Sequence, residues 1–214
     1  MKILALNGSP RRQKWNTVTL LQSALEGAAE AGAETELIQL YDLHYSGCIS
    51  CFSCKRKDRK KDGVCAVQDE LAPVLEKIRT ADAFIIGTPV YYGAESAATR
   101  ALIERLCFPY LKYAKNYQSL FPRKIKTALL CTMNVPEESL ATYGYDSRFE
   151  LTRNTLAMHF GECELFLSTN TLQYPDYDKY ESELFDKHAK LKHHEEVFPQ
   201  ECKQAFALGA RLVS

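Results

Sequence analysis

Short apolar runs alternate with helical patterns along this chain, and that alternation limits the fold more than any other feature. Strand-like runs lie at residues 2–6, 34–40, 83–87, 126–132 and 162–168. Apolar residues recur at helical spacing over 17–31, 69–79, 95–106 and 147–160, and the tail from 180 to 212 is largely helical with an interruption near Pro199. The run at 83–87 is apolar throughout, which is typical of a strand covered on both faces. We therefore predict an α/β fold, with a doubly wound parallel sheet and helices on both of its faces.

Length and charge narrow the class of protein. A chain of 214 residues suits a single domain over 1–214, in which residues 41–67 form an irregular cysteine-rich loop. The formal net charge is zero, so there is no electrostatic reason to expect nucleic acid or membrane binding. No apolar run reaches the roughly 20 residues of a membrane span, and the apolar start is too short for a signal peptide. We expect a cytoplasmic protein, whose eight cysteines stay reduced and serve as ligands, redox groups or core residues.

The loop after the first strand has the chemistry of a phosphate site. In a doubly wound sheet, ligands bind beyond the carboxyl ends of the strands. Residues 8–17 offer side-chain donors from Ser9, Asn16 and Thr17, and Arg11 adds a forked, charged donor. Asn16 or Thr17 could also cap the helix that follows. The loop lacks the glycine patterns of dinucleotide and nucleoside triphosphate sites, which favours a terminal monophosphate. The alternative is an ordinary turn followed by a helix cap.

The loop after the third strand could line a flat ring. Pro89 and Val90 stiffen it, Tyr91 and Tyr92 offer aromatic faces, and Gly93 allows a close approach of the backbone. A buried aromatic turn without a ligand is the alternative.

These two loops together resemble the NADPH-dependent FMN reductase and iron–sulfur flavoprotein group of the flavodoxin-like superfamily. The resemblance covers roughly residues 1–135 and continues beyond them in topology alone. It implies a five-stranded parallel sheet in the order 2-1-3-4-5. It also implies that Ser9, Arg11, Asn16 and Thr17 hold the phosphate of FMN and that residues 89–93 line the isoalloxazine ring. The loop 132–134, with Asn134, would touch the other side of the flavin. This chain departs from the group by having Lys14 and Trp15 before Asn16, where a small residue is usual.

Four cysteines, Cys48, Cys51, Cys54 and Cys65, are spaced so that their thiolates can converge on one metal centre. Iron–sulfur flavoproteins, which the chain resembles, use a compact four-cysteine motif in this loop for a [4Fe–4S] cluster. Here ten residues separate Cys54 from Cys65, a longer gap than the compact motif has. A reduced loop without metal, a zinc site and a redox disulfide are the alternatives. Cys107, Cys131, Cys163 and Cys202 are expected to fill the core.

The expected function is an FMN-dependent NAD(P)H oxidoreductase. Hydride would pass from NADH or NADPH to the flavin, and electrons would then reach a quinone, a nitro compound or a free flavin. The flavin carries this chemistry, so no catalytic side chain is nominated. An electron carrier with FMN and an iron–sulfur cluster is one alternative, and a flavin-free binding protein is another. Relatives pair to cover the flavin, so we expect a homodimer or higher homo-oligomer. The aromatic segment 108–121 would either supply the interface or pack on its own domain.

Overall fold

The computed structural model describes residues 1–59, 63–116, 118–181 and 183–214. Its centre is a sheet of parallel strands in the order β2-β1-β3-β7-β8. These strands are β1 (Lys2–Asn7), β2 (Glu34–Gln39), β3 (Ala83–Tyr91), β7 (Ile125–Thr132) and β8 (Gly161–Ser168). The predicted order 2-1-3-4-5 is thereby confirmed. Two short additions lie outside it: β4 (Ala94–Glu95) pairs with β3, and β5 (Leu111–Lys112) pairs with β6 (Gln118–Ser119).

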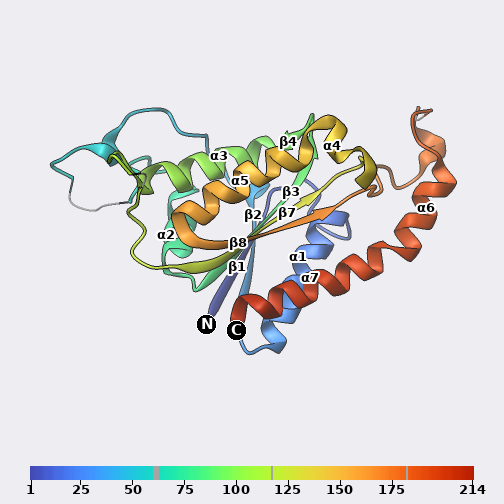
Figure 1. Ribbon diagram of the computed structural model, residues 1–214, viewed down its shortest axis with the longest axis horizontal. Helices are drawn as coiled ribbons and strands as arrows, with labels where there is room; N and C mark the ends of the chain where they lie inside the picture. Colours follow the sequence, from blue (N-terminus) through green and yellow to red (C-terminus); the bar gives the residue numbers. More distant parts are fainter. Residues whose placement is uncertain (60–62, 117, 182) are drawn as a thin grey trace.

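Helices cover both faces of the sheet (Figure 1). On one face lie α1 (Asn16–Glu30) and α7 (Phe198–Val213). On the other lie α2 (Ala72–Thr80), α3 (Ala97–Cys107) and α5 (Tyr145–Phe160). A separate hydrophobic core lies on each face of the sheet, because successive side chains of a strand point to opposite faces. Ile3 and Ala5 of β1 face α1 and α7, whereas Leu4 and Leu6 face the opposite layer. The two remaining helices are α4 (Leu140–Tyr143) and α6 (Lys187–Glu196).

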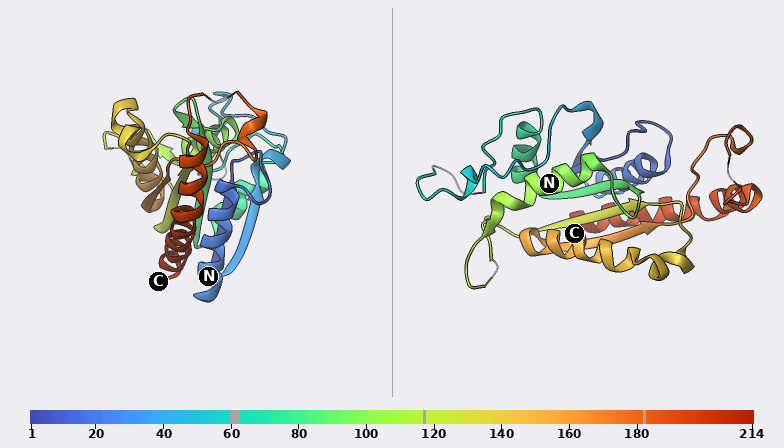
Figure 2. Two further views of the ribbon diagram at one scale, coloured as in Figure 1. Left: turned by 90° about the vertical axis from the view of Figure 1, so that its right-hand side faces the viewer. Right: turned by 90° about the horizontal axis from the view of Figure 1, so that it is seen from above.

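Helices α1 and α7 lie side by side because two glycines let them approach closely (Figure 2). A Cβ atom on Gly27 would lie 2.0 Å from the main-chain oxygen of Phe206. A Cβ atom on Gly209 would lie 1.7 Å from the main-chain oxygen of Ala24. The C-terminal helix is thus packed against the helix that follows the first loop.

Some predicted boundaries and roles were wrong. The helix expected from residue 69 begins at Ala72, because the carboxylate of Asp69 instead accepts hydrogen bonds from the Leu71 amide and from Arg105. Neither Asn16 nor Thr17 caps α1. Both lie in its first turn, and the N-cap residue is Trp15, which makes no side-chain cap hydrogen bond. The helical tail begins at 187 rather than 180, and α7 starts with Pro199 in its first turn.

The aromatic segment 108–121 packs mainly on its own chain. Tyr110 and Phe121 are buried, and their ring centroids lie 5.7 and 4.9 Å from that of Phe160. Tyr113 is exposed, and Tyr117 lies outside the described residues. The interface role suggested for Tyr110 and Phe121 is therefore wrong, because their rings fill the core. Among the described residues, no helix has the length and apolar character needed to cross a membrane.

Candidate functional site

A pocket of about 610 Å³ lies where β1, β3 and β7 end, and we call it the strand-end pocket. The structure brings nine of the ten residues predicted for the flavin site together in its lining. They are Ser9, Arg11, Asn16, Thr17, Pro89, Val90, Tyr91, Tyr92 and Asn134. Gly93 does not line it and lies next in the chain, where a Cβ atom would be 3.0 Å from the Tyr145 ring. Residues from three separate loops thus meet in one place, as expected for the carboxyl edge of a parallel sheet.

Gly8 positions the first loop. Its amide donates a 2.8 Å hydrogen bond to the main-chain oxygen of Gly87, which ties the end of β1 to β3. Its own carbonyl accepts a 2.6 Å hydrogen bond from the hydroxyl of Ser96, the N-cap residue of α3. A Cβ atom on Gly8 would lie 1.8 Å from Thr99 Oγ1, so any other residue there would displace the Thr99 side chain of α3. The loop is held against α3 from its first residue.

One end of the strand-end pocket suits an anion. The N-terminus of α1 has neither a capping side chain nor an acidic residue in its first turn, and its partial positive charge adjoins the pocket. The Thr17 hydroxyl lies 2.7 Å from the Thr132 hydroxyl, and Asn16 Nδ2 donates a 2.8 Å hydrogen bond to the Leu172 carbonyl. Arg11 stacks 4.0 Å above the Trp15 ring and donates to the Gln173 carbonyl. These contacts orient the donors before any ligand binds.

The other end is aromatic and open. Tyr92 and Gly93 have φ angles of +50° and +75°, which fits the two-residue hairpin turn that joins β3 to β4. This turn leaves the Tyr92 ring fully exposed. Burial raises the pKa of the neighbouring Tyr91 hydroxyl, so Tyr91 stays neutral at physiological pH. Two exposed aromatic rings, of which Tyr92 is the more exposed, thus form the mouth of the pocket.

Asn134 carries an unused acceptor. Its Nδ2 atom donates a 2.7 Å hydrogen bond to Gln173 Oε1, but its buried Oδ1 atom has no partner in the structure. A buried polar atom without a partner costs free energy, and a ligand N–H group would remove that cost. Asn134 therefore points to a ligand that carries hydrogen-bond donors.

Sequence reasoning missed the loop after β8. The residues of this loop that line the strand-end pocket are Thr171, Leu172 and Gln173. Leu172 accepts the hydrogen bond from Asn16 described above, and Gln173 accepts those from Arg11 and Asn134. The signal was present, because a polar run follows the fifth strand at the same edge of the sheet. Phe185 also lines the pocket, and no local motif marks it.

The four cysteines predicted to be ligands lie at the opposite end of α3. Cys48, Cys51, Cys54 and Cys65 line one small cavity against the end of that helix, and we call them the cysteine cluster. All eight cysteines are free thiols in the structure. Within the described residues, no three His, Cys, Asp or Glu side chains are close enough to hold a single metal ion.

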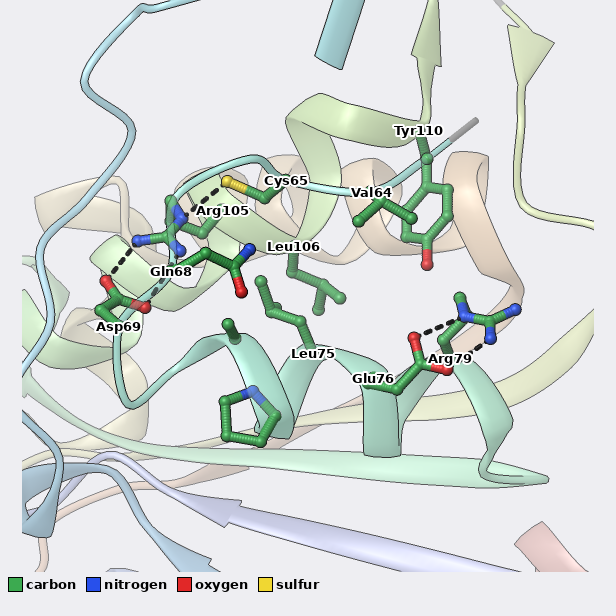
Figure 3. Close-up of a pocket in the computed structure, with 13 residues that line it drawn as sticks. Val64, Cys65, Gln68, Asp69, Leu75, Glu76, Arg79, Arg105, Leu106 and Tyr110 are labelled. Carbon is green, nitrogen blue, oxygen red and sulfur yellow. Dashed lines mark hydrogen bonds and ion pairs between the residues drawn. The ribbon is translucent and has the colours of Figure 1, made fainter. Parts of the chain in front are cut away.

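Arg105, a buried residue near the end of α3, holds the cysteine-rich loop in place (Figure 3). Its guanidinium donates to Cys65 Sγ at 3.1 Å and to both carboxylate oxygens of Asp69 at 2.8 and 3.2 Å. It also donates to the carbonyls of Ser46 and Val67. The hydrogen bonds from Arg105 hold the pKa of the Asp69 carboxyl below its usual value. One side chain thus ties both ends of the loop to α3 and forms a wall of a neighbouring pocket of about 390 Å³.

Replacing Arg105 with methionine is expected to lower the free energy of unfolding by about 3 kcal/mol, because Asp69 and two carbonyls lose their buried partner. Arg79→Met is the matched control. Its ion pair with Glu76 is exposed, and its loss should cost less than about 1 kcal/mol. Urea denaturation followed by circular dichroism measures both. Equal losses in the two variants would contradict the role given to Arg105.

The sheet order and the pocket beyond its strands define a flavodoxin-like α/β protein. The sequence matches the model of the NADPH-dependent FMN reductase family over residues 1–128, and the chain belongs to that family. An iron-sulfur flavoprotein of Methanocaldococcus jannaschii is 40% identical over 105 residues, which are 49% of this chain and 51% of the relative. One from Archaeoglobus fulgidus is 39% identical over 105 residues, or 49% of this chain and 48% of the relative. The match therefore spans about half the length of these curated relatives.

Solved structures agree on the fold. An NAD(P)H:quinone oxidoreductase from Methanothermobacter marburgensis has a TM-score of 0.73 at 18% identity, covering 99% of this chain and 98% of that one. An FMN-dependent NADH-azoreductase from Bacillus anthracis, solved with FMN, has a TM-score of 0.68 at 13% identity and full coverage of both chains. At such low identity these likenesses show the fold alone.

Proposed function

We propose that this chain is an electron-transfer flavoprotein that binds FMN in the strand-end pocket and an iron–sulfur cluster on the cysteine cluster. The observation that carries the proposal is the gathering of the four cysteines around one cavity, in a chain that also has a separate ligand-sized pocket at the strand ends. The names of the curated relatives, which are iron-sulfur flavoproteins, support it. When bound, the flavin would exchange electrons in pairs with a nicotinamide cofactor and the cluster would exchange them singly.

The strand-end pocket fits FMN in size and chemistry. Its volume of about 610 Å³ is within the range of small-molecule sites. Ser9, Asn16 and Thr17, with the uncapped N-terminus of α1, suit the phosphate. Val90, Tyr91 and Tyr92 suit the ring, and the unpartnered oxygen of Asn134 suits one of its N–H groups.

The cysteine cluster supplies the side chains that a thiolate-binding group requires. The pKa of the Cys54 thiol is raised, mainly by burial; the Lys55 charge lowers it, and the other three cysteines raise it because like charges repel. Bound iron ions would offset the repulsion among the negative charges of four such thiolates, because a metal ion stabilises the deprotonated form of its thiol ligands. Cys65 receives a hydrogen bond from Arg105, the kind of contact that orients a ligand and tunes a cluster.

The two sites stand at opposite ends of α3, whose 11 residues span about 16 Å. Ser96 at its N-cap touches the first loop, whereas Glu104 near its end accepts a hydrogen bond from the Cys48 amide. The mouth of the strand-end pocket at Tyr91 and Tyr92 is open, so a bound flavin ring would stay exposed to solvent unless a second copy of the chain covered it. We include a homo-oligomer in the proposal for this reason. Sedimentation of a monomer at micromolar concentration would remove that part of it.

A second candidate is a reductase that passes electrons from NAD(P)H through FMN to a quinone, a nitro compound or a free flavin without a cluster. The open, aromatic mouth at Tyr91 and Tyr92 favours it, because a nicotinamide or an acceptor could stack there. Both candidates require bound FMN, but only the first requires bound iron.

Purification without oxygen tests the proposal. We expect bound FMN together with iron and acid-labile sulfide, and a broad visible absorption that remains after the flavin is removed. Adding NADH or NADPH then reports reduction of each chromophore. Flavin without iron would favour the reductase, and a colourless protein that ignores added FMN would eliminate both candidates.

A further inference from the structure

Lys190, on α6, is a buried cation beside the strand-end pocket. Its side chain is almost completely buried. Its Nζ atom donates a 2.7 Å hydrogen bond to the main-chain oxygen of Asn134 and lies 5.0 Å from the centroid of the Phe185 ring. Asn134 and Phe185 both line the pocket, so the ammonium group stands directly behind its wall. Helix α6 lies beyond residues 1–128, the part of the chain that matches the family model.

Among the residues that the structure describes, no carboxylate balances the charge of Lys190. Burial lowers the pKa of Lys190 to about 8, and no carboxylate among the described residues offsets that effect. Lys187 on the same helix, by contrast, forms an ion pair with Asp178 at 2.5 Å. A buried ammonium group without a counter-ion costs folding free energy, so its place beside a pocket points to a negative charge supplied by the ligand.

We propose that Lys190 raises the reduction potential of the flavin by stabilising the negative charge that the ring gains on reduction. This inference rests on FMN binding in the strand-end pocket. Uptake of two electrons and one proton leaves the ring with one more negative charge than its oxidised form. A fixed cation behind the pocket wall therefore favours the reduced form over the oxidised form.

Two substitutions separate the charge of Lys190 from its anchoring hydrogen bond. Lys190→Met removes both, and Lys190→Gln keeps a donor for the Asn134 carbonyl but removes the charge. Lys192→Met, on the exposed side of the same helix, is the matched control. Removing an unbalanced buried charge should leave the fold intact. If the methionine variant does not fold, the glutamine variant decides.

The measurement is the midpoint potential of bound FMN, from an anaerobic titration with dithionite followed by flavin absorbance, together with the dissociation constant of oxidised FMN. In both Lys190 variants we expect reduced FMN to bind about tenfold more weakly relative to oxidised FMN, a shift of about 30 mV to lower potential for two electrons. Lys192→Met should match the wild type. A wild-type potential in Lys190→Gln would overturn the proposal and leave Lys190 as an anchor. Failure of the wild type to bind FMN would overturn the proposed function itself, and this inference with it.

Discussion

Replacing Cys54 with serine is expected to reduce the iron content of anaerobically purified protein at least about tenfold, because a serine hydroxyl does not ionise to replace a thiolate ligand. Cys54 is the most deeply buried member of the cysteine cluster, so water and exogenous thiols cannot easily take its place. FMN content should stay unchanged, since the strand-end pocket lies at the other end of α3. Iron and sulfide analysis, with flavin absorbance on the same sample, measures both.

Cys202→Ser is the control for Cys54→Ser. Cys202 is a partly buried cysteine of α7, outside the cysteine cluster. Its replacement should leave both iron and flavin at the wild-type level. Full iron content in Cys54→Ser, or equal losses in the two variants, would show that the cysteine cluster is not the ligand set.

Asn16→Asp is expected to weaken FMN binding by roughly a thousandfold while riboflavin binds as before. The substitution keeps the shape of the side chain but places a carboxylate where the phosphate is proposed to bind. Two negative charges about 4 Å apart at a partly solvated site repel by about 4 kcal/mol, which corresponds to that factor. Fluorescence quenching titrations with FMN and with riboflavin measure the difference.

The matched control for Asn16→Asp is Asn16→Ala. Both variants lose the hydrogen bond to the Leu172 carbonyl, but the alanine variant adds no charge. In the acidic variant, the favourable position of a carboxylate in the first turn of a helix opposes its repulsion from the Leu172 carbonyl, so circular dichroism must first show that both variants fold. If FMN and riboflavin weaken equally in Asn16→Asp, the first loop shapes the pocket but does not hold a phosphate.

Local patterns predicted the sheet well. Strands buried on both faces are short and apolar, and the residues at their ends must face the same edge. For that reason Ser9, Tyr91 and Asn134, which are more than forty positions apart in the sequence, could be assigned to one site before the structure was known.

The parts that could not be predicted depend on contacts between distant segments. Arg105 sits in a helical pattern where an arginine is normally exposed, and only the folded loop around it reveals that it is buried. Phe185 lines the strand-end pocket, and Lys190 contacts its wall at Asn134, from a tail with no motif of its own. Asp69 was assigned to a helix because helix propensity does not report its hydrogen bond with the distant Arg105, which keeps it outside α2.

Helix α3 connects the strand-end pocket to the cysteine cluster, and each of its ends is hydrogen-bonded to one of the two loops. Ser96 braces the first loop at one end, and Glu104 and Arg105 hold the cysteine-rich loop at the other. The cysteine-rich loop therefore depends on α3 for its conformation. If residues 41–67 alone were transplanted between two relatives, the cysteines would lose their hydrogen bonds to the end of α3. A functional transplant must therefore also include the last turn of α3.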